Sequence, residues 1–326
     1  MATNRTILVT GGLGLIGHNV VAQLEQQGHT VIITDTKTNY GIIPPAELDY
    51  LLTERRKKII TDRIYSIDIA DREGIDWLIR THRPDTVVHL ASFPRQKVVN
   101  AYPQWGSRTM SEGLLNLLEA CKSHTVCKFV YISSSMVYGD FTDDVTEDAK
   151  CQPQGQYGIM KLAGEWLVRD YTRRTKMAHV IIRPSAVYGP LDVEDRVISK
   201  FLLTAMRDAV IKVNGASETL DFTYVDDAAK GIVAATLLDV VNKTYNITKS
   251  HSRTLLEAAE LAVKIVGKGT IQIQDKDEDF PSRGALNIQA ARQDLGFDPQ
   301  VDVEEGFQQY YEWLAGSTFW AKQLSK

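Results

Sequence analysis

"TILVTGGLGLIGHNVVAQLEQQG", residues 6–28, is the stretch that decides the fold. Its first five residues are apolar or β-branched and predict a strand, while the residues after the glycines predict a helix. Glycine occupies positions 11, 12, 14 and 17 of the turn between them, and Gly28 stands where a helix C-cap is expected. A strand, a glycine-rich turn and a helix in this order are typical of a dinucleotide-binding site.

The glycines of this turn have separate physical roles. One permits the tight turn from strand to helix, another lets backbone N–H groups approach a diphosphate, and a third lets the helix pack on the strand. The N-terminus of the helix adds a partial positive charge that favours an anion. The other common phosphate loop needs Gly-Lys-Ser or Gly-Lys-Thr after its glycines, which this stretch lacks. A glycine cluster without a ligand is the alternative, and the strands and helix around the turn disfavour it.

An acidic residue follows the second apolar run. "TVIIT", residues 30–34, predicts a strand, and Asp35 stands at its end. A carboxylate there accepts hydrogen bonds from both hydroxyls of an adenosine ribose and repels a 2′-phosphate, so NAD is favoured over NADP. Lys37 is the one nearby residue that would favour NADP.

Short apolar runs recur along the first half of the chain, and most are separated by enough residues for one helix. Strands that are apolar throughout are typical of a parallel sheet covered by helices on both faces. The sequence therefore predicts an α/β fold with a Rossmann-type doubly wound parallel sheet. The expected strands span residues 6–10, 30–34, 63–67, 86–90, 128–133 and 178–183.

The pattern changes at about residue 191. A helix is expected around 194–207, followed by "ETLDFTYVDD" (218–227) and a final amphipathic stretch, "VEEGFQQYYEWL" (303–314). We expect residues 1–190 to form an NAD-binding Rossmann domain. Residues 191–326 are expected to form a smaller α/β substrate lobe that is interleaved with it.

Composition excludes several classes of partner. The 326 residues are 44% apolar and 24% charged, with a net charge of −4 that attracts neither nucleic acid nor an anionic membrane. The chain reaches its first strand within six residues, without an export signal or an apolar run of about 18 residues, so we expect a cytoplasmic protein. The three cysteines have no zinc-like spacing, and we expect no metal.

"QYGIMKLAGE", residues 156–165, places Tyr157 four residues before Lys161. Residues with this spacing share one face of a helix. A neighbouring ammonium and the positive nicotinamide would lower the pKa of the tyrosine from its usual value of about 10, which would make it a base for a sugar hydroxyl. Serines 133–135 stand at the end of the expected fifth strand and supply a hydroxyl at the sheet edge where such folds bind ligands. A solvated surface pair is the alternative, disfavoured by the glycine turn, Asp35 and these serines.

These motifs occur together with "HLAS" (89–92), "SSSMVYG" (133–139), "RPSAVYGP" (183–190) and "DFTYVDDAAKGI" (221–232). In order and spacing they resemble the extended short-chain dehydrogenase/reductases, most of all the NAD-dependent nucleotide-sugar epimerase/dehydratase family. The resemblance extends over nearly the whole chain. It implies that the first domain binds NAD and that the C-terminal lobe binds a nucleoside-diphosphate sugar.

The resemblance assigns roles to individual residues. It implies that Tyr157 is the catalytic base, that Lys161 binds the nicotinamide ribose and tunes Tyr157, and that Ser134, four residues before Tyr138, is the third catalytic residue. The other implied cofactor-binding residues, in addition to Tyr157 and Lys161, are Gly11, Gly14, Leu15, Ile16, Gly17, Asp35, Asp68, Ile69, Leu90 and Ala91.

Two arginines are candidates for the substrate diphosphate, because guanidinium groups offer forked donors. Arg196, in "DRVISKF" (195–201), resembles the arginine of the RVVSNF segment of UDP-glucuronate decarboxylases, and Arg283 lies in "FPSRGAL" (280–286). An exposed arginine without a ligand is the alternative for each. Ser134 and Ser135 complete the expected substrate-binding residues.

The sequence departs from the family pattern at several positions. Sugar dehydratases carry Thr-Asp-Glu where this chain has Ser134, Ser135 and Met136, and a methionine cannot transfer the proton that elimination requires. The asparagines typical of 4-epimerases are replaced by Met110 and Ala186. An arginine expected before the "DFTYVDD" stretch is replaced by Leu220.

The leading interpretation is an NAD-dependent nucleotide-sugar epimerase that works by hydride transfer through a transient 4-keto sugar. The alternative is a net oxidoreductase on a nucleotide sugar, either a C4 dehydrogenase or a 4-ketoreductase. A non-catalytic NAD-sensing regulator is a minor third reading, because such proteins usually lose Tyr or Lys of the pair. Family relatives lead us to expect a homodimer formed through the helices near residues 102–122 and 155–175.

Overall fold

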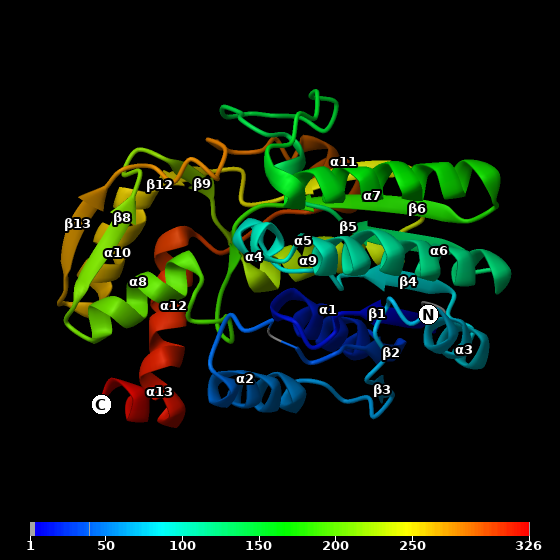
Figure 1. Ribbon diagram of the computed structural model, residues 1–326, viewed down its shortest axis with the longest axis horizontal. Coiled ribbons are helices and arrows are strands. Elements are labelled where there is room, and N and C mark those ends of the chain that lie inside the picture. Colours follow the sequence, from blue (N-terminus) through cyan, green and yellow to red (C-terminus); the bar gives the residue numbers. More distant parts are fainter. Residues whose placement is uncertain (1–3, 39, 326) are drawn as a thin grey trace.

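The computed structural model describes residues 4–38 and 40–325. A seven-stranded parallel sheet, in the order β11-β6-β5-β4-β1-β2-β3, forms the centre of the molecule (Figure 1). The Rossmann-type α/β fold expected from the sequence is confirmed. The strands are β1 (Thr6–Thr10), β2 (Thr30–Thr34), β3 (Ile64–Tyr65), β4 (Thr86–His89), β5 (Lys128–Ile132), β6 (Ala178–Pro184) and β11 (Lys243–Ile247).

All six expected strands are present, with two differences. The run at 63–67 forms a strand only over Ile64–Tyr65, because this edge strand pairs with β2 alone and over two residue pairs. The seventh strand, Lys243–Ile247, was not expected from the sequence. It comes from the C-terminal half of the chain and pairs with β6, so the chain returns to the first sheet after leaving it.

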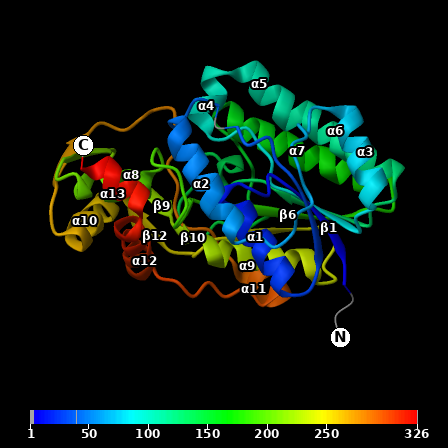
Figure 2. The same ribbon diagram turned by 90° about the horizontal axis from the view of Figure 1, so that it is seen from below.

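Helices cover both faces of the sheet, which explains why its strands are apolar throughout. Figure 2 shows the two layers on opposite sides of the strands. One layer contains α1 (Leu15–Gln26), α9 (Val225–Leu237) and α11 (Gln289–Leu295). The other contains α3 (Arg72–His82), α6 (Gly113–Ser123) and α7 (Gly155–Arg174).

A smaller lobe lies beside the carboxyl ends of the strands and has a hydrophobic core of its own (Figure 1). The helix expected at 194–207 is α8, and the amphipathic 303–314 stretch lies within α12. A capping box between Thr254 and Glu257 starts α10. The elements are α8 (Val197–Met206), β8 (Val210–Asn214), β9 (Thr219–Asp221), β12 (Ser252–Thr254), α10 (Leu255–Val266), β13 (Thr270–Gln274), α12 (Val303–Gly316) and α13 (Thr318–Leu324).

The remaining elements lie in the connections between those already described. They are α2 (Pro45–Lys57), α4 (Gln96–Ala101), α5 (Pro103–Ser107), a π-helical turn (Arg108–Glu112), a 3₁₀ turn (Ser135–Val137), β7 (Val187–Tyr188) and β10 (Thr223–Tyr224). None of the helices in the described ranges combines the length and the apolar character needed to cross a bilayer.

Candidate active site

The glycine-rich turn is a narrow backbone cradle at the start of α1. Gly11 has a φ of +70°, and a Cβ there would lie 2.7 Å from the backbone nitrogen of Ala91. A Cβ on Gly17 would run into the carbonyl oxygen of Gly11, and the Gly14 N–H donates to that same oxygen at 3.0 Å. The missing side chains therefore let the turn approach Ala91 and the start of α1 closely, and the resulting cradle of backbone groups beside the helix N-terminus fits a dinucleotide.

Asp35 is held in place at the end of β2. Its carboxylate accepts the N–H of Leu13 from the turn at 2.9 Å and the N–H of Lys37 at 2.8 Å. The backbone of Lys37 thus helps to orient the acid. Asp35 is fixed beside the glycine cradle, at the position where the sequence predicts a ribose contact.

The expected adenine-side residues follow β3. Asp68 is exposed and its Oδ1 accepts the N–H of Ala70 at 2.9 Å, while Ile69 is buried against Gly113. Burial raises the pKa of the Tyr40 phenol, and the nearby charge of Asp68 raises it further. Its ring centroid is 4.2 Å from that of Phe93. No sequence motif points to Tyr40 or Phe93.

Leu90 and Ala91 follow β4 and border the glycine cradle. Their N–H groups donate to the backbone carbonyl and the side-chain Oγ1 of Thr10, at 3.1 and 3.2 Å. Leu15 and Ile16, at the start of α1, are half-buried and pack against apolar residues that include Val187, Val225 and Ala228.

Tyr157 and Lys161 lie in the first turns of α7. The Lys161 Nζ is 5.8 Å from the centroid of the Tyr157 ring and donates to the Ile132 carbonyl oxygen at 2.7 Å. Burial lowers the pKa of Lys161 to about 7, and the charge of Glu165 acts in the opposite direction. The expected pair is therefore directed toward the end of β5.

Ser134 faces this pair from the end of β5. Its Oγ accepts the N–H of Met136 at 3.2 Å and starts the 3₁₀ turn. Burial raises the pKa of Tyr157, while the charge of Arg196, a hydrogen bond with Ser134 and the charge of Arg283 oppose that rise. Serine, tyrosine and both candidate arginines thus lie within electrostatic reach of one another.

The two arginines reach the site from the smaller lobe. Arg196 directly precedes α8, and its Nε lies 3.9 Å from Asp192 Oδ2. Arg283 lies in the loop that pairs with Phe141, and its buried Nε has no hydrogen-bond partner among the described residues. Burial, reinforced by the nearby charge of Arg196, lowers the pKa of Arg283 to about 10. Two neighbouring guanidinium groups with unused hydrogen-bonding capacity fit a bound anion.

Ser135 lies differently from Ser134. Its hydroxyl donates to Ser185 at 3.2 Å, and the side chain is buried in the loop. Met136, which occupies a position where sugar dehydratases have an acid, is also buried, and its thioether cannot transfer a proton. Met110 lies in the π-helical turn and packs with Phe93 close to Tyr157.

Several residues near the site were not expected from the sequence. Arg95 has a φ of +65° and pairs with Asp195 at 2.6 Å, which joins the loop after β4 to the loop before α8. Gln96 donates to the carbonyl oxygens of Gln154 and Asp279 at 3.3 and 2.9 Å. These contacts connect residues far apart in the chain, and no local pattern signals them.

Comparisons with known proteins give a consistent result. The sequence profile described as "NAD dependent epimerase/dehydratase family" matches residues 7–248. An uncharacterised UDP-glucose epimerase of Bacillus subtilis (strain 168) is 30% identical over 310 residues, which cover 92% of this chain and 95% of the relative. A dTDP-glucose 4,6-dehydratase of Neisseria meningitidis serogroup B (strain ATCC BAA-335 / MC58) is 28% identical over 353 residues, with coverages of 98% and 96%.

Solved structures with the same fold include two epimerases. UDP-glucuronic acid 4-epimerase from Bacillus cereus, in complex with UDP-glucuronic acid and NAD, is 28% identical with a TM-score of 0.86 and covers 98% of this chain and 99% of that one. UDP-glucose 4-epimerase from Thermotoga maritima, with UDP-glucose, is 26% identical with a TM-score of 0.86 and coverages of 95% and 98%. The similarity therefore extends along almost the whole chain.

Proposed function

Because the chain belongs to the NAD-dependent epimerase/dehydratase family, we propose that it is a nucleotide-sugar epimerase that works through a transient 4-keto sugar. As a member of this family it is an NAD-dependent enzyme of the extended short-chain dehydrogenase/reductase type. The proposal concerns which reaction it performs on which sugar.

The observation that carries the proposal is the composition of the site around Tyr157. A base, a hydroxyl and an ammonium are present as Tyr157, Ser134 and Lys161, which suffices for reversible oxidation of a sugar hydroxyl. Met136 stands where elimination would need a proton-transferring acid. This argues against 4,6-dehydration, although several relatives bear that name.

The cofactor would be held by the cradle of Gly11, Gly14 and Gly17 together with Asp35, the acid that favours NAD over NADP. Leu15, Ile16, Asp68, Ile69, Leu90 and Ala91 would line the adenosine and diphosphate. When bound, NAD supplies a hydride acceptor and donor for the sugar carbon. All other chemistry falls to the side chains around Tyr157.

Tyr157 would take the proton from the sugar hydroxyl, most simply at C4, and return it when the ketone is reduced. Burial raises the pKa of this phenol, so nearby positive charge is needed to favour the phenolate. Arg196, Arg283 and the Lys161 ammonium supply that charge. Ser134 would hold the reacting oxygen, and Lys161 would also hold the nicotinamide ribose.

The substrate is proposed to be a nucleoside-diphosphate sugar, with its diphosphate held by Arg196 and Arg283. The unsatisfied Nε of Arg283 supports this assignment, because a buried donor without a partner is costly. The names of the relatives point to UDP- or dTDP-sugars. In this scheme residues 1–190 hold NAD and residues 191–326 hold the nucleotide, while Ser134 belongs to the sugar side and Ser135, whose hydroxyl donates to Ser185, supports the loop behind it.

A net oxidoreductase is the second candidate. Met110 and Ala186, in place of two asparagines typical of 4-epimerases, favour it because apolar side chains there remove polar contacts to sugar or cofactor.

The purified enzyme is incubated with UDP-glucose, UDP-glucuronate or dTDP-glucose while the absorbance of reduced cofactor and the sugar NMR spectrum are followed. We expect the NMR spectrum to show the epimer while the absorbance of reduced cofactor does not change. Stoichiometric release of NADH, or strict dependence on added NADH, would support the oxidoreductase instead.

A homodimer is also proposed, formed through α5, the π-helical turn, α6 and α7. These elements contact one another and expose several large apolar side chains. Ile159 and Trp166 lie seven residues apart, so they share one face of α7. Surface patches of this kind are typical of protein interfaces. The exposed apolar residues are Tyr102, Trp105, Leu115, Ile159 and Trp166.

A further inference from the structure

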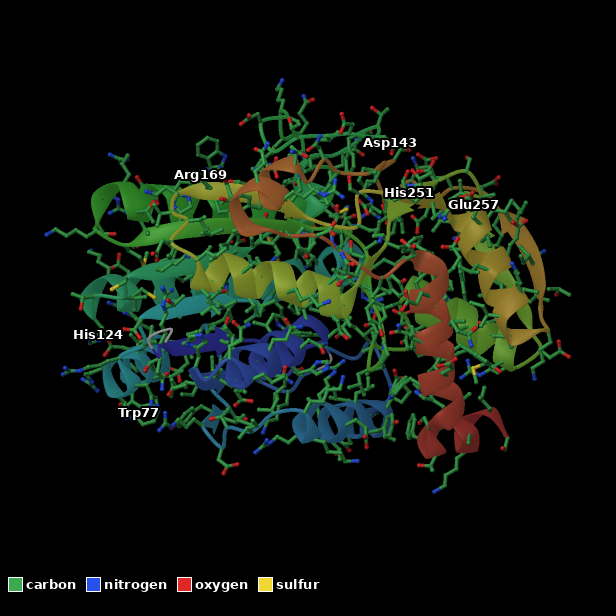
Figure 3. All side chains as sticks on the ribbon, turned by 180° about the vertical axis from the view of Figure 1, so that it is seen from behind. Trp77, His124, Asp143, Arg169, His251 and Glu257 are labelled. Carbon is green, nitrogen blue, oxygen red and sulfur yellow. The ribbon has the colours of Figure 1, made fainter. Side chains whose placement is uncertain are left out.

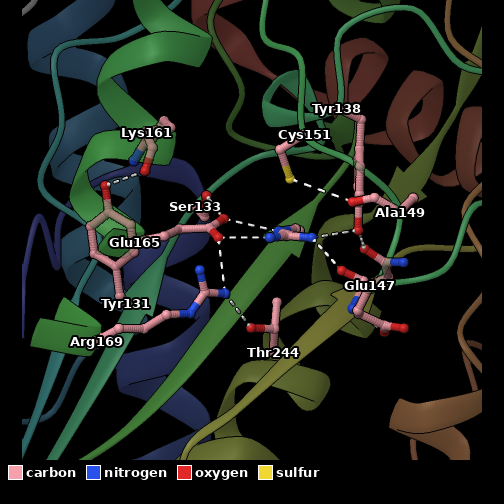
Figure 4. A network of polar contacts seen from close by, with 12 residues as sticks. Tyr131, Ser133, Tyr138, Glu147, Ala149, Cys151, Lys161, Glu165, Arg169 and Thr244 are labelled. Atoms are coloured by element: carbon pink, nitrogen blue, oxygen red, sulfur yellow. Dashed lines mark hydrogen bonds and ion pairs between the residues drawn. The ribbon is translucent and has the colours of Figure 1, made fainter. Parts of the chain in front are cut away.

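Glu165 lies one helical turn after Lys161 on α7, and its side chain is fully buried, with 0% exposure. Its Oε1 accepts hydrogen bonds from Ser133 Oγ at 2.6 Å and Arg183 Nε at 2.9 Å, and its Oε2 accepts Arg183 Nη2 at 2.7 Å. Figure 4 shows this network. A forked arginine–carboxylate pair of this kind has a single well-defined geometry.

The partners of Glu165 tie α7 to the end of β5. Ser133 directly precedes Ser134, and the residue before it, Ile132, accepts the hydrogen bond from Lys161 Nζ. The last residue of β5, Ile132, and the residue that follows it, Ser133, are therefore bound by two side chains one turn apart on α7. The next residue of the chain is Ser134, whose hydroxyl faces Tyr157.

Arg183, on β6, is itself held firmly. Its Nη1 donates to the Tyr138 hydroxyl at 2.9 Å and to the Glu147 carbonyl oxygen at 3.0 Å. The Tyr138 hydroxyl in turn donates to Asn246 Oδ1 at 2.8 Å (Figure 4). Burial lowers the pKa of Arg183, but bonding to Glu165 more than offsets this and raises it. Arg183 is therefore a fixed cation.

The surroundings of Lys161 contain few charges. Tyr131, on β5, has its ring centroid 5.4 Å from Nζ, and burial raises its pKa well above 10, so it is neutral. His89, on β4, is neutral as well, because burial and the charge of Lys161 lower its pKa to about 3. Tyr157 is the third neighbour. Among the described residues, Glu165 is the acid whose charge favours the ammonium form of Lys161.

We propose that Glu165 is a positioning residue of this site. Through Ser133 it fixes Ser134 against Tyr157, and through its charge, one turn away, it favours the ammonium form of Lys161. The inference rests on the proposed function for the roles of Tyr157 and Ser134 and for the contact of Lys161 with the nicotinamide ribose. The Lys161 part can be measured without any sugar substrate.

The experiment compares the wild type with Glu165→Gln. The affinity for NAD is measured by titration calorimetry over a range of pH. Lys161 is charged below its pKa of about 7 and neutral above it, so NAD affinity should fall as the pH rises through that region. Loss of the Glu165 charge should move this fall to lower pH by about one unit. An unchanged pH profile would overturn the charge role.

A second variant separates the effect of Glu165 on Lys161 from its pairing with Arg183. Glu165→Gln leaves Arg183 buried without its carboxylate, which can unfold the protein. The double variant Glu165→Gln/Arg183→Met removes both charges and restores a neutral interior. If Glu165 only neutralised Arg183, the double variant would regain the wild-type pH profile and kcat. We expect it to fold while the profile stays shifted.

Two further variants test the tether, which is the hydrogen bond from Ser133 to Glu165. Ser133→Ala keeps the charge of Glu165 but removes the bond to β5, so we expect at least a tenfold lower kcat with an unchanged pH profile and sugar KM. The matched control is Arg169→Ala. Arg169 touches Glu165 at 3.3 Å from the outer part of α7 and lies nearer the surface (Figure 3), so its removal should change kcat less than twofold. A Ser133→Ala enzyme with wild-type kcat would overturn the tether.

The outcomes also separate this inference from the proposed function. If NAD binds with a shifted pH profile in Glu165→Gln but no sugar is epimerised, the proposed reaction fails and the charge role of Glu165 stands. If epimerisation occurs and the profile does not move, the reaction stands and the charge role fails.

Discussion

At the scale of single residues, Tyr157 combines a half-buried side chain with the nearby charges of Arg196 and Arg283. Burial opposes ionisation of the phenol, and the nearby arginines and the hydroxyl of Ser134 favour it. A tyrosine in this environment acts as a base only while those groups keep their positions. The proposed chemistry therefore depends on the arrangement of these side chains as much as on Tyr157 itself.

Replacing Tyr157 tests the proposed base. Tyr157→Phe removes the proton-accepting oxygen, so kcat for epimerisation should fall at least about a hundredfold. NAD affinity should stay within about twofold of the wild type, since the phenol is one of many cofactor contacts. Steady-state kinetics and calorimetry measure the two effects.

The matched control is Tyr171→Phe, on the same helix, where the hydroxyl is bonded to Glu119 on the outer side. It should keep full activity. An active Tyr157→Phe enzyme would contradict the assignment. Loss of activity with NAD binding intact would reject a non-catalytic NAD sensor.

Asp35 is the residue that should decide cofactor preference. Asp35→Asn keeps an oxygen that can accept the Leu13 N–H but removes the negative charge. The affinity for NADP relative to NAD should therefore rise about tenfold, since repulsion of the 2′-phosphate is lost. Fluorescence titration with both cofactors measures the ratio. The control, Lys37→Ala, keeps the backbone N–H that contacts Asp35, and a changed ratio there would show that Lys37 contacts the 2′-phosphate.

At the scale of elements, β1 and β4 are joined by more than their backbone ladder. His89 Nδ1 lies 2.8 Å from Thr10 Oγ1 at the ends of these strands, next to the glycine cradle. The imidazole is buried, and burial together with Lys161 lowers its pKa from 6.5 to about 3. Protonation of His89 at low pH should therefore destabilise the ends of β1 and β4 beside the glycine cradle.

The sign of this effect follows from proton uptake. Below pH 6.5 the unfolded chain protonates His89 while the folded protein does not, so the free energy of unfolding falls as the pH is lowered toward about 3. In this range the free energy of unfolding of His89→Asn should fall by about 1.4 kcal/mol less per pH unit than that of the wild type. Urea unfolding at several pH values gives the slopes. Thr10→Ala, which keeps the imidazole, should be less stable at every pH with the slope of the wild type. Equal slopes for the wild type and His89→Asn would contradict the prediction.

At the scale of the whole molecule, the face formed by α5, α6 and α7 is unusual for a monomer. Trp105 is 60% and Trp166 63% exposed on neighbouring elements. Because α7 also carries Tyr157 and Lys161, a partner bound to its outer face would hold the catalytic helix from behind. Assembly would then contribute to the rigidity of the site.

The dimer is tested by placing charge on this face. Trp166→Glu should weaken self-association at least about thirtyfold, because a central buried tryptophan contributes about 2 kcal/mol or more to an interface. Light scattering after size-exclusion chromatography measures the mass. The matched control is Trp77→Glu, an exposed tryptophan on α3 outside the patch (Figure 3). A wild type that is monomeric at all concentrations would refute the proposal.

Local patterns in the sequence determined much of this protein. The glycine-rich turn, Asp35 and the spacing of Tyr157 and Lys161 are readable because each depends on a few neighbouring residues. The six expected strands are present because apolar runs of this length become parallel strands when helices separate them. The family resemblance placed Ser134 by its distance from Tyr138, again along a short stretch.

Only the tertiary structure decided the rest. The seventh strand, β11, is recognised only when it pairs with β6, and only the folded chain shows that the loop with Arg283 brings this charge near Tyr157. The same holds for the bond between Ser133 and Glu165, and for Ser135, whose hydroxyl is turned toward Ser185. These contacts join segments far apart in the chain, and the packing that brings them together depends on all the elements at once, so no local pattern specifies them.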